Sequence, residues 1–258
     1  MPGEQPLIID SRSARREFTQ CQKCGKDKEH YKIKLSVCTG CHISTYCSQE
    51  CQRAHWPSHK AMCIQRREAT EKCAKMDQTV VDHDPILRPL PSEIVAELRS
   101  FTQKFNPALF QASINCLKLA QAGVHSNIWK EVVVMVMLNR LTDVKPDSRA
   151  WSRYTVELVV PLPIGYVVDK LAGGDHSLVQ RMQEQEAHHR ENGSAGSITT
   201  VMCTMCESTG QSRMIHNVTF YGFGQHSFSA VEISEDRWVD QLKETVEKMS
   251  GRTTGTSS

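Results

Sequence analysis

The chain has 258 residues, of which 39% are hydrophobic and 23% are charged, and its formal net charge is +2 at neutral pH. This length suits one ordinary domain with a small module, not a large multidomain enzyme, and so small a net charge disfavours a polyanion binder acting over the whole chain. No apolar run approaches the roughly 18 to 20 residues that cross a bilayer, and the first residues lack the features of a signal peptide. We therefore expect a soluble intracellular protein with no membrane attachment.

Cysteine is concentrated near the N-terminus. Seven of the eleven cysteines lie between Cys21 and Cys63, and the remaining four are spread over the rest of the chain. Because intracellular thiols stay reduced, clustered cysteines indicate a metal site more than a disulfide framework.

The spacing of these residues predicts zinc ligands in four pairs: Cys21 and Cys24, Cys38 and Cys41, Cys47 and Cys51, His59 and Cys63. A Cys-x2-Cys turn aims two thiolates at one ion, and a three-residue gap places two ligands on one helical face. Eight donors, four for each closed site, imply two structural Zn²⁺ and no open position for a catalytic water. We expect no catalytic residues here.

The segment from Tyr46 through Gln52 and Trp56 to Cys63 resembles the MYND-type zinc finger, which also has these four ligand pairs. The resemblance covers residues 18–66. It implies a cross-brace in which the pairs interleave, with one zinc held by Cys21, Cys24, Cys47 and Cys51, and the other by Cys38, Cys41, His59 and Cys63. The module has too few large aliphatic residues for their burial to offset its chain entropy. We therefore expect chelation of the metal to unfold it. The other histidines of the segment, His30, His42 and His55, are expected to be exposed.

The resemblance also implies a ligand. MYND fingers are protein-interaction modules that bind proline-containing peptides, and the peptide-contacting positions of the family correspond here to Thr39, Gln52 and Trp56. The alternative is that Trp56 only caps the small core of the module. Nucleic acid is a competing ligand, because residues 1–70 hold twelve Lys or Arg against seven Asp or Glu. These basic residues are spread and interrupted by acids, so a solvated surface is the better interpretation.

Beyond the finger we expect a polar helix and a linker over residues 67–91. Pro57 favours a short finger helix over residues 57–63, and the helix-forming residues 64–76 extend it outward. Three prolines between Pro85 and Pro91 then favour an extended linker. Residues 1–17 and 251–258 are expected to be disordered.

The order of expected helices and strands in residues 92–250 predicts an α+β domain with a mostly antiparallel sheet of about four strands. The expected order starts with a helix from Ile94 to Phe105 and a second helix opened by Asn106 and Pro107. It continues with strands at 132–138 and 154–160, a helix at 178–192, strands at 198–206 and 213–223, and a helix with Trp238, Leu242, Val246 and Met249 on one face.

This domain shows no recognised catalytic motif. Cys203 and Cys206 have no second cysteine pair nearby, and a strand points residues three apart to opposite faces, so metal or redox chemistry there is disfavoured. His188, His189 and His216 could in principle complete such a site, but histidines of this kind are more often exposed or packed. A SET and MYND type of lysine methyltransferase is the enzymatic alternative, but no Asn-His cofactor motif is present.

We therefore expect a non-enzymatic zinc-binding adaptor whose finger docks proline-containing segments of other proteins. The linker itself contains Pro85-x-Leu87-x-Pro89, a segment of the Pro-x-Leu-x-Pro type that MYND fingers bind. Contact of residues 85–89 with the finger, within one chain or between two, is one hypothesis. A plain spacer is the other.

Overall fold

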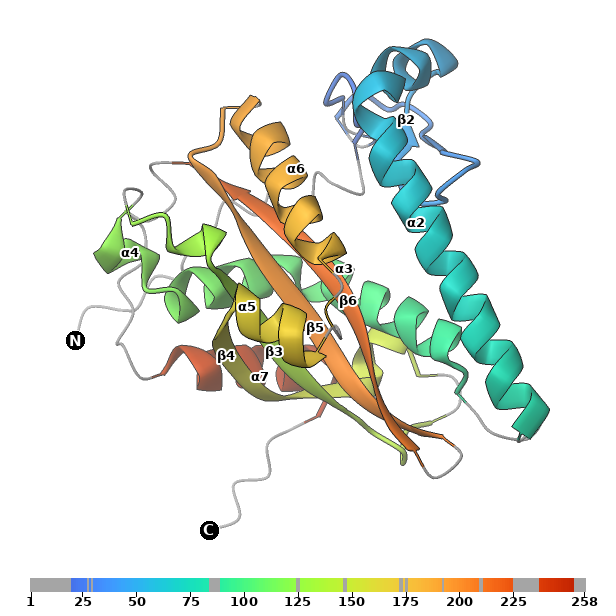
Figure 1. The fold of residues 1–258 in the computed structure, drawn as a ribbon, viewed down its shortest axis with the longest axis vertical. Coiled ribbons are helices and arrows are strands. Elements are labelled where there is room, and N and C mark those ends of the chain that lie inside the picture. Colours follow the sequence, from blue (N-terminus) through green and yellow to red (C-terminus); the bar gives the residue numbers. More distant parts are fainter. Residues whose placement is uncertain are drawn as a thin grey trace. The chain divides into compact units, whose positions relative to one another are not determined.

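The computed structural model describes residues 20–26, 28, 30–83, 89–123, 126–145, 148–171, 174, 176–191, 193–208, 211–224 and 237–252. The expected disordered segment 1–17, residues 253–258 of the expected disordered tail 251–258, and most of the linker motif at 85–89 lie outside these residues. The described chain divides into two compact units. One holds residues 20–94 together with Ser208 and Gln211, and the other holds the remaining described residues from Val95 onward. Figure 1 shows the helices and strands of each unit.

The N-terminal unit is a small hairpin followed by a long helix. Strand β1 (Ser36–Val37) pairs antiparallel with β2 (Thr45–Tyr46), and α2 (Gln49–His83) follows almost at once. The hydroxyl oxygen of Ser48 accepts a hydrogen bond of 3.2 Å from the backbone N–H of Cys51, so Ser48 caps the first turn of α2. As the sequence predicted, the helix continues outward beyond the finger.

The predicted start of this helix was wrong. Pro57 lies inside α2 and not in its first turn. A proline in a helix interior removes one backbone hydrogen bond and normally kinks or ends the helix. Here Cys51 precedes the proline and His59 and Cys63 follow it, and all three belong to metal-ligand clusters, which hold both parts of the helix.

The prediction that Pro107 begins a new helix was also wrong. Helix α3 (Pro91–Cys116) is one helix that contains Pro107, where the sequence predicted two helices. Its N-terminus has Pro91 in the first turn, and a carboxylate oxygen of Glu93 accepts a hydrogen bond of 2.7 Å from the N–H of Leu90. Phe105 and Leu109, on either side of Pro107, are both buried, so core packing outweighs the backbone bond lost at the proline.

The C-terminal unit is built on a four-stranded sheet of order β4-β3-β5-β6. The remaining elements are α4 (Leu119–Ala122), η1 (Ile128–Lys130), β3 (Val132–Arg140), η2 (Ala150–Arg153), β4 (Tyr154–Pro163), α5 (Ile164–Tyr166), η3 (Val167–Leu171), α6 (Ser177–Glu191), β5 (Gly196–Ser208), β6 (Gln211–Phe223) and α7 (Trp238–Met249). The sheet is mixed, because β3 pairs antiparallel with β4 and parallel with β5.

A bulge changes which residues of β4 face the core. The β3–β4 register shifts between Met137 and Leu138, so that Leu138 pairs with Val156 and Met137 pairs with Leu158. The apolar residues Tyr154, Val156 and Leu158 alternate in the sequence, but the alternation of buried side chains breaks after Val156. Leu158 is 48% exposed and Val159 is buried instead.

Helices cover both faces of the sheet (Figure 1). On one face, residues of α6 pack with residues of β3, η3 and β6 in a cluster of Val133, Val167, Leu178, Met182 and Phe220. On the other face lies α3, whose Ser113 is hydrogen-bonded to Thr200 of β5 at 2.8 Å and whose Phe110 contacts Tyr221 of β6. Phe220 and Tyr221 are consecutive residues of β6 that serve opposite faces.

A buried carboxylate ties α3 to the edge of the sheet. Glu97 is 5% exposed, and its carboxylate accepts hydrogen bonds from Arg140 at 2.8 and 3.1 Å, Arg153 at 2.6 Å and the hydroxyl of Tyr154 at 2.8 Å. Burial opposes ionisation, but the hydrogen bonds from Arg140, Tyr154 and Arg153 together hold the pKa of Glu97 below its ordinary value. The ionised form is therefore the one that the fold stabilises.

We predict that Glu97→Gln lowers the free energy of unfolding by about 3 kcal/mol at neutral pH, because two arginines lose their buried counter-ion. A carboxyl whose pKa is depressed in the folded state contributes stability above its unfolded pKa of about 4.3, and this contribution is lost as the pH falls. The deficit of the variant should therefore shrink at acidic pH. Urea denaturation at several pH values measures it. The exposed Glu157→Gln is the control, and an equal loss in both variants would contradict the assignment.

Candidate metal centre

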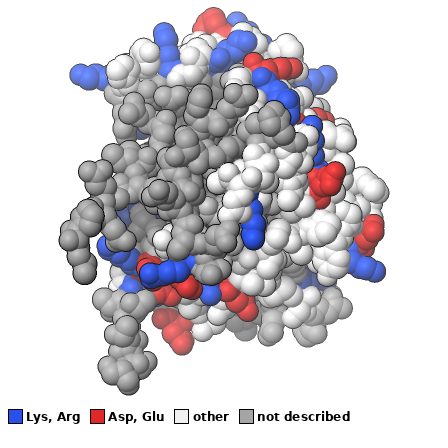
Figure 2. Space-filling model, turned by 90° about the vertical axis from the view of Figure 1, so that its left-hand side faces the viewer, with Lys and Arg blue, Asp and Glu red and all other residues white. Residues whose placement is uncertain are grey.

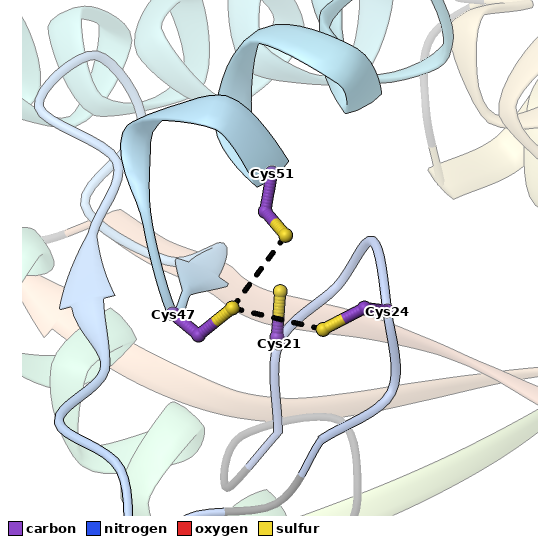
Figure 3. A group of neighbouring side chains, drawn as sticks. All are labelled: Cys21, Cys24, Cys47 and Cys51. Carbon is purple, nitrogen blue, oxygen red and sulfur yellow. Dashed lines mark hydrogen bonds between the residues drawn. The ribbon is translucent and has the colours of Figure 1, made fainter.

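Four cysteines from two distant segments form the first cluster. Cys21 and Cys24 come from an N-terminal turn, Cys47 precedes α2, and Cys51 lies in its first turn. The sulfur atoms point toward one another (Figure 3), with Cys47 at 3.6 Å from Cys24 and 3.5 Å from Cys51. All four sulfurs lie within 4.8 Å of one another.

The second cluster consists of Cys38, Cys41, His59 and Cys63, and all four residues are buried. The two cysteines of the β1–β2 connection meet two ligands of α2. The sulfur of Cys38 lies 3.9 Å from that of Cys63, and the sulfur of Cys41 lies 3.7 Å from Nε2 of His59. Nε2 is therefore the ring nitrogen that faces the cluster.

These separations fit tetrahedral zinc. A Zn–S bond of about 2.3 Å places two thiolates of a tetrahedron about 3.8 Å apart, and a Zn–N bond of about 2.0 Å shortens the distance slightly. The distances in both clusters lie close to these values. Each cluster has four donors, which is the closed coordination of a structural zinc site.

Local backbone geometry brings the ligands of the two turns together. Gly25, with φ +70°, donates its N–H to the carbonyl of Cys21 and closes the first turn. In the second turn the N–H of His42 donates to the carbonyl of Cys38, and the N–H of Cys38 donates to the carbonyl of Ser44. Gly40 has no side chain for a different reason, because a Cβ there would lie 2.9 Å from the sulfur of Cys63.

The core of the finger is made largely of its own ligands. Its buried residues are Cys21, Cys38, Cys41, Tyr46 and Cys63, and the partly buried residues packed against them are Leu35, Ile43, Cys47 and Cys51. Such a core has little apolar surface to offset the chain entropy, so the metal must supply the difference.

The pKa values of the cysteine thiols differ within each cluster. Burial raises the pKa of Cys41, but hydrogen bonds from His59 and from the backbone of Ser44 and Ile43 outweigh it and bring the pKa to about 5. Backbone N–H groups likewise outweigh burial at Cys21 and lower its pKa to about 6. In contrast, hydrogen bonding with Cys51 and burial raise the pKa of Cys47 to about 12.

Two closed four-ligand sites made from interleaved pairs define a cross-braced zinc finger. The MYND finger family matches residues 21–63, so this module is a MYND finger, a protein-interaction module, and its clusters fit two zinc sites. The interleaving that the resemblance implied is the one that the structure shows.

Two of the curated proteins that resemble this chain match it in the same region. They are the SET domain and MYND-type zinc finger protein 6 of Schizosaccharomyces pombe, 39% identical over 57 residues, and the human histone-lysine N-methyltransferase SMYD3, 42% identical over 43 residues. These matches cover 22% and 17% of this chain, but only 10% and 9% of the relatives. The chain thus spans about a tenth of their length. No solved structure matches the chain.

The three positions that the resemblance to MYND fingers assigns to peptide contacts lie near the second cluster. Gln52 and Trp56 are one helical turn apart on α2, and the side-chain amide of Gln52 donates to the sulfur of Cys38 at 3.8 Å. Thr39 directly follows Cys38 and is exposed. Trp56 is 43% exposed, and its ring meets that of His59 edge to face at 6.0 Å.

Other histidines and cysteines lie elsewhere. His30 and His42 are exposed, and His55 is half-buried, with Nδ1 2.9 Å from the hydroxyl of Tyr46. Among the residues that the structure describes, no cluster with metal-ligand geometry contains Cys203, Cys206, His188, His189 or His216. Burial raises the pKa of Cys203 to about 12, which leaves it an inert thiol. Within the described chain, no helix is both long and apolar enough to span a bilayer.

We predict that Gly40→Ala weakens zinc binding at the second site, because the new methyl group collides with the sulfur of Cys63. Overpacking of this kind costs about 1 to 3 kcal/mol, or roughly ten- to a hundredfold in affinity. Competition with a chromophoric chelator measures the change. Gly165→Ala, where a Cβ meets no atom within 4 Å, is the control and should bind zinc normally. Equal affinities for the two variants would count against the predicted collision.

We also predict that zinc binding at neutral pH releases protons and weakens as the pH falls. Cys21 and Cys41 already favour the thiolate at pH 7, whereas burial raises the pKa of Cys63 to about 11 and Cys47 is also protonated without metal. Calorimetric zinc titrations of the metal-free protein in buffers of different protonation enthalpy count the released protons. A binding enthalpy that is independent of the buffer would contradict this.

Proposed function

We propose that the protein is a non-enzymatic adaptor whose finger docks proline-containing peptides on the surface formed by Thr39, Gln52 and Trp56. The observation that carries the proposal is the exposure of Trp56. If its indole only capped the small core, it would be covered, yet 43% of it faces outward. Its edge-to-face contact with the ring of His59 fixes this exposed indole on a metal ligand.

Gln52 supplies a polar group of fixed direction. Its Nε2 donates to the sulfur of Cys38, which directs that end of the amide toward the metal cluster. The carbonyl oxygen Oε1 is then the end that accepts a backbone N–H from a bound segment. An aromatic ring next to a fixed acceptor suits an extended peptide in which a proline stacks on the ring and a neighbouring residue donates.

The proposal that the chain is not an enzyme rests on what its relatives share with it. The two curated relatives described above, one of which is a histone-lysine N-methyltransferase, match only in and around the finger. A shared interaction module does not carry the catalytic site of the relative with it. We propose instead that the C-terminal unit provides a second contact or a dimer surface. No disulfide bond forms among the described cysteines, which fits an intracellular setting.

The linker segment Pro85-x-Leu87-x-Pro89 is a candidate ligand within the protein itself. Its first four residues lie outside the described chain, and the proposal rests on the sequence alone. A linker that occupies the finger, in its own chain or in a second copy, would compete with peptides from other proteins.

Nucleic acid is the less favoured ligand. On the part of the surface that the described residues form in Figure 2, Lys and Arg side chains are interspersed with Asp and Glu. A nucleic-acid site normally gathers its basic residues into one patch or stripe.

We expect a fluorescently labelled peptide of residues 82–93 to bind the full-length zinc-loaded protein with a saturable rise in anisotropy. Trp56→Ala should weaken binding about tenfold or more, because the indole supplies the stacking surface. Leu87→Ala in the peptide should weaken it similarly. Leu87→Ala in the protein should strengthen it if the linker competes within the chain.

The control variant is Tyr31→Ala, which removes another exposed aromatic side chain of the finger, at 52% exposure. It should bind the peptide normally, and all variants should retain two zinc ions per chain. If the labelled peptide and a panel of other proline-rich peptides produce no response while zinc is fully bound, the docking proposal is wrong. The finger would then serve as a structural support.

A further inference from the structure

Ser44 lies against the back of the zinc ligand His59. It belongs to the connection between β1 and β2 and is 6% exposed, and its hydroxyl oxygen lies 3.4 Å from Nδ1 of His59. Nε2 of the same ring faces Cys41 in the metal cluster. A metal-bound imidazole carries its proton on the other nitrogen, so Nδ1 is the donor and Ser44 is the acceptor.

Arg66 supplies the second hydrogen bond to this hydroxyl. Its Nη1 donates to Oγ of Ser44 at 3.0 Å, and its side chain is half-buried. A hydroxyl oxygen accepts two hydrogen bonds, so His59 and Arg66 together use the acceptor capacity of Ser44. Arg66 follows Cys63 by three residues on α2, which puts both side chains on the same side of the helix.

The net negative charge of the metal site explains why the guanidinium of Arg66 is favourable beside it. Three thiolates and one Zn²⁺ leave the Cys38, Cys41, His59 and Cys63 site with a net charge of −1, in a group of residues that are all buried. The guanidinium of Arg66 is always protonated, and its hydrogen bond to Ser44 holds it next to this site. The all-cysteine site contains no imidazole whose second nitrogen needs a partner.

We propose that Ser44 and Arg66 are positioning residues of the histidine-containing zinc site. They fix the ring and the tautomer of His59 and thereby set how tightly this site, and not the all-cysteine site, holds its metal. The hydrogen-bonded chain from Arg66 through Ser44 to His59 also connects the metal site to the part of α2 that follows the last ligand, Cys63. Loss of outer-shell partners of this kind typically weakens metal binding by about 10- to 100-fold.

The test uses the full-length protein loaded with ¹¹³Cd²⁺. Its two sites differ in donor set, four sulfurs against three sulfurs and one nitrogen, so each gives its own ¹¹³Cd NMR resonance. The resonances are followed while a competing chelator is added. Ser44→Ala and Arg66→Ala should each lose the histidine-containing site at a chelator concentration about 10- to 100-fold lower than the original protein, while the all-cysteine site is unchanged.

Three further measurements separate a positioning role from a general loss of stability. Ser44→Thr keeps the hydroxyl and should restore metal binding close to that of the original protein. In ¹⁵N-histidine spectra, the Nδ1 proton of His59 should exchange with water faster in Ser44→Ala. The double variant should lose less than the product of the two single effects, because both residues act through one hydrogen-bonded chain.

Lys72→Ala removes an exposed cation from the same helix, six residues after Arg66, and is the matched control. It should leave both resonances unchanged. The proposal is overturned if Ser44→Ala and Arg66→Ala leave the histidine-containing site as strong as before. It is equally overturned if both sites weaken together, since this would show a general loss of stability.

Discussion

Zinc coordination by helix α2 is the constraint on which the N-terminal unit depends. This helix provides Cys51 to one site and His59 and Cys63 to the other, so that each metal ion fastens it to a different turn of the chain. The same coordination accounts for a helix that continues through Pro57, because the ligands on both sides of the proline are held independently. Without metal the finger would retain a core composed mainly of thiols, which cannot offset the entropy of ordering its loops.

The metal site was predictable from the sequence because its information is local. Pairs of ligands two or three residues apart have a direct geometric meaning, and all eight ligands were found in this way. Which pairs share a metal is not local, since Cys21 and Cys47 are far apart in the chain, and only the resemblance to a known family supplied that answer. The hydrophobic periodicity of the C-terminal unit likewise predicted its strands β3 and β5, and its helix α7.

The sequence-based predictions of the C-terminal unit fail where side-chain packing or strand pairing overrides a local sequence rule. Pro107 has the features of a helix start, yet buried side chains on both sides keep α3 continuous. The exposure of Leu158 depends on a bulge set by the pairing of β4 with β3, which no pattern within β4 reveals. The network around Glu97 and the hydrogen-bonded chain from Arg66 through Ser44 to His59 join residues that are 15 or more positions apart and have no spacing signal in the sequence. Contacts of this kind require the coordinates.

The histidine-containing cluster is where the metal ligands and the proposed peptide-contacting residues meet. Trp56 contacts the ring of His59, Gln52 donates to Cys38, and the hydroxyl of Ser44 lies behind the same imidazole. Two of the three proposed peptide-contacting residues are therefore held by ligands of one metal ion, and the all-cysteine site contributes by fixing the first turn of α2. An indole on a loop would have to be ordered when its ligand binds, at a cost in entropy. In the proposed adaptor, zinc orders the indole of Trp56 before a peptide binds, and this would let so small a module present a rigid binding surface.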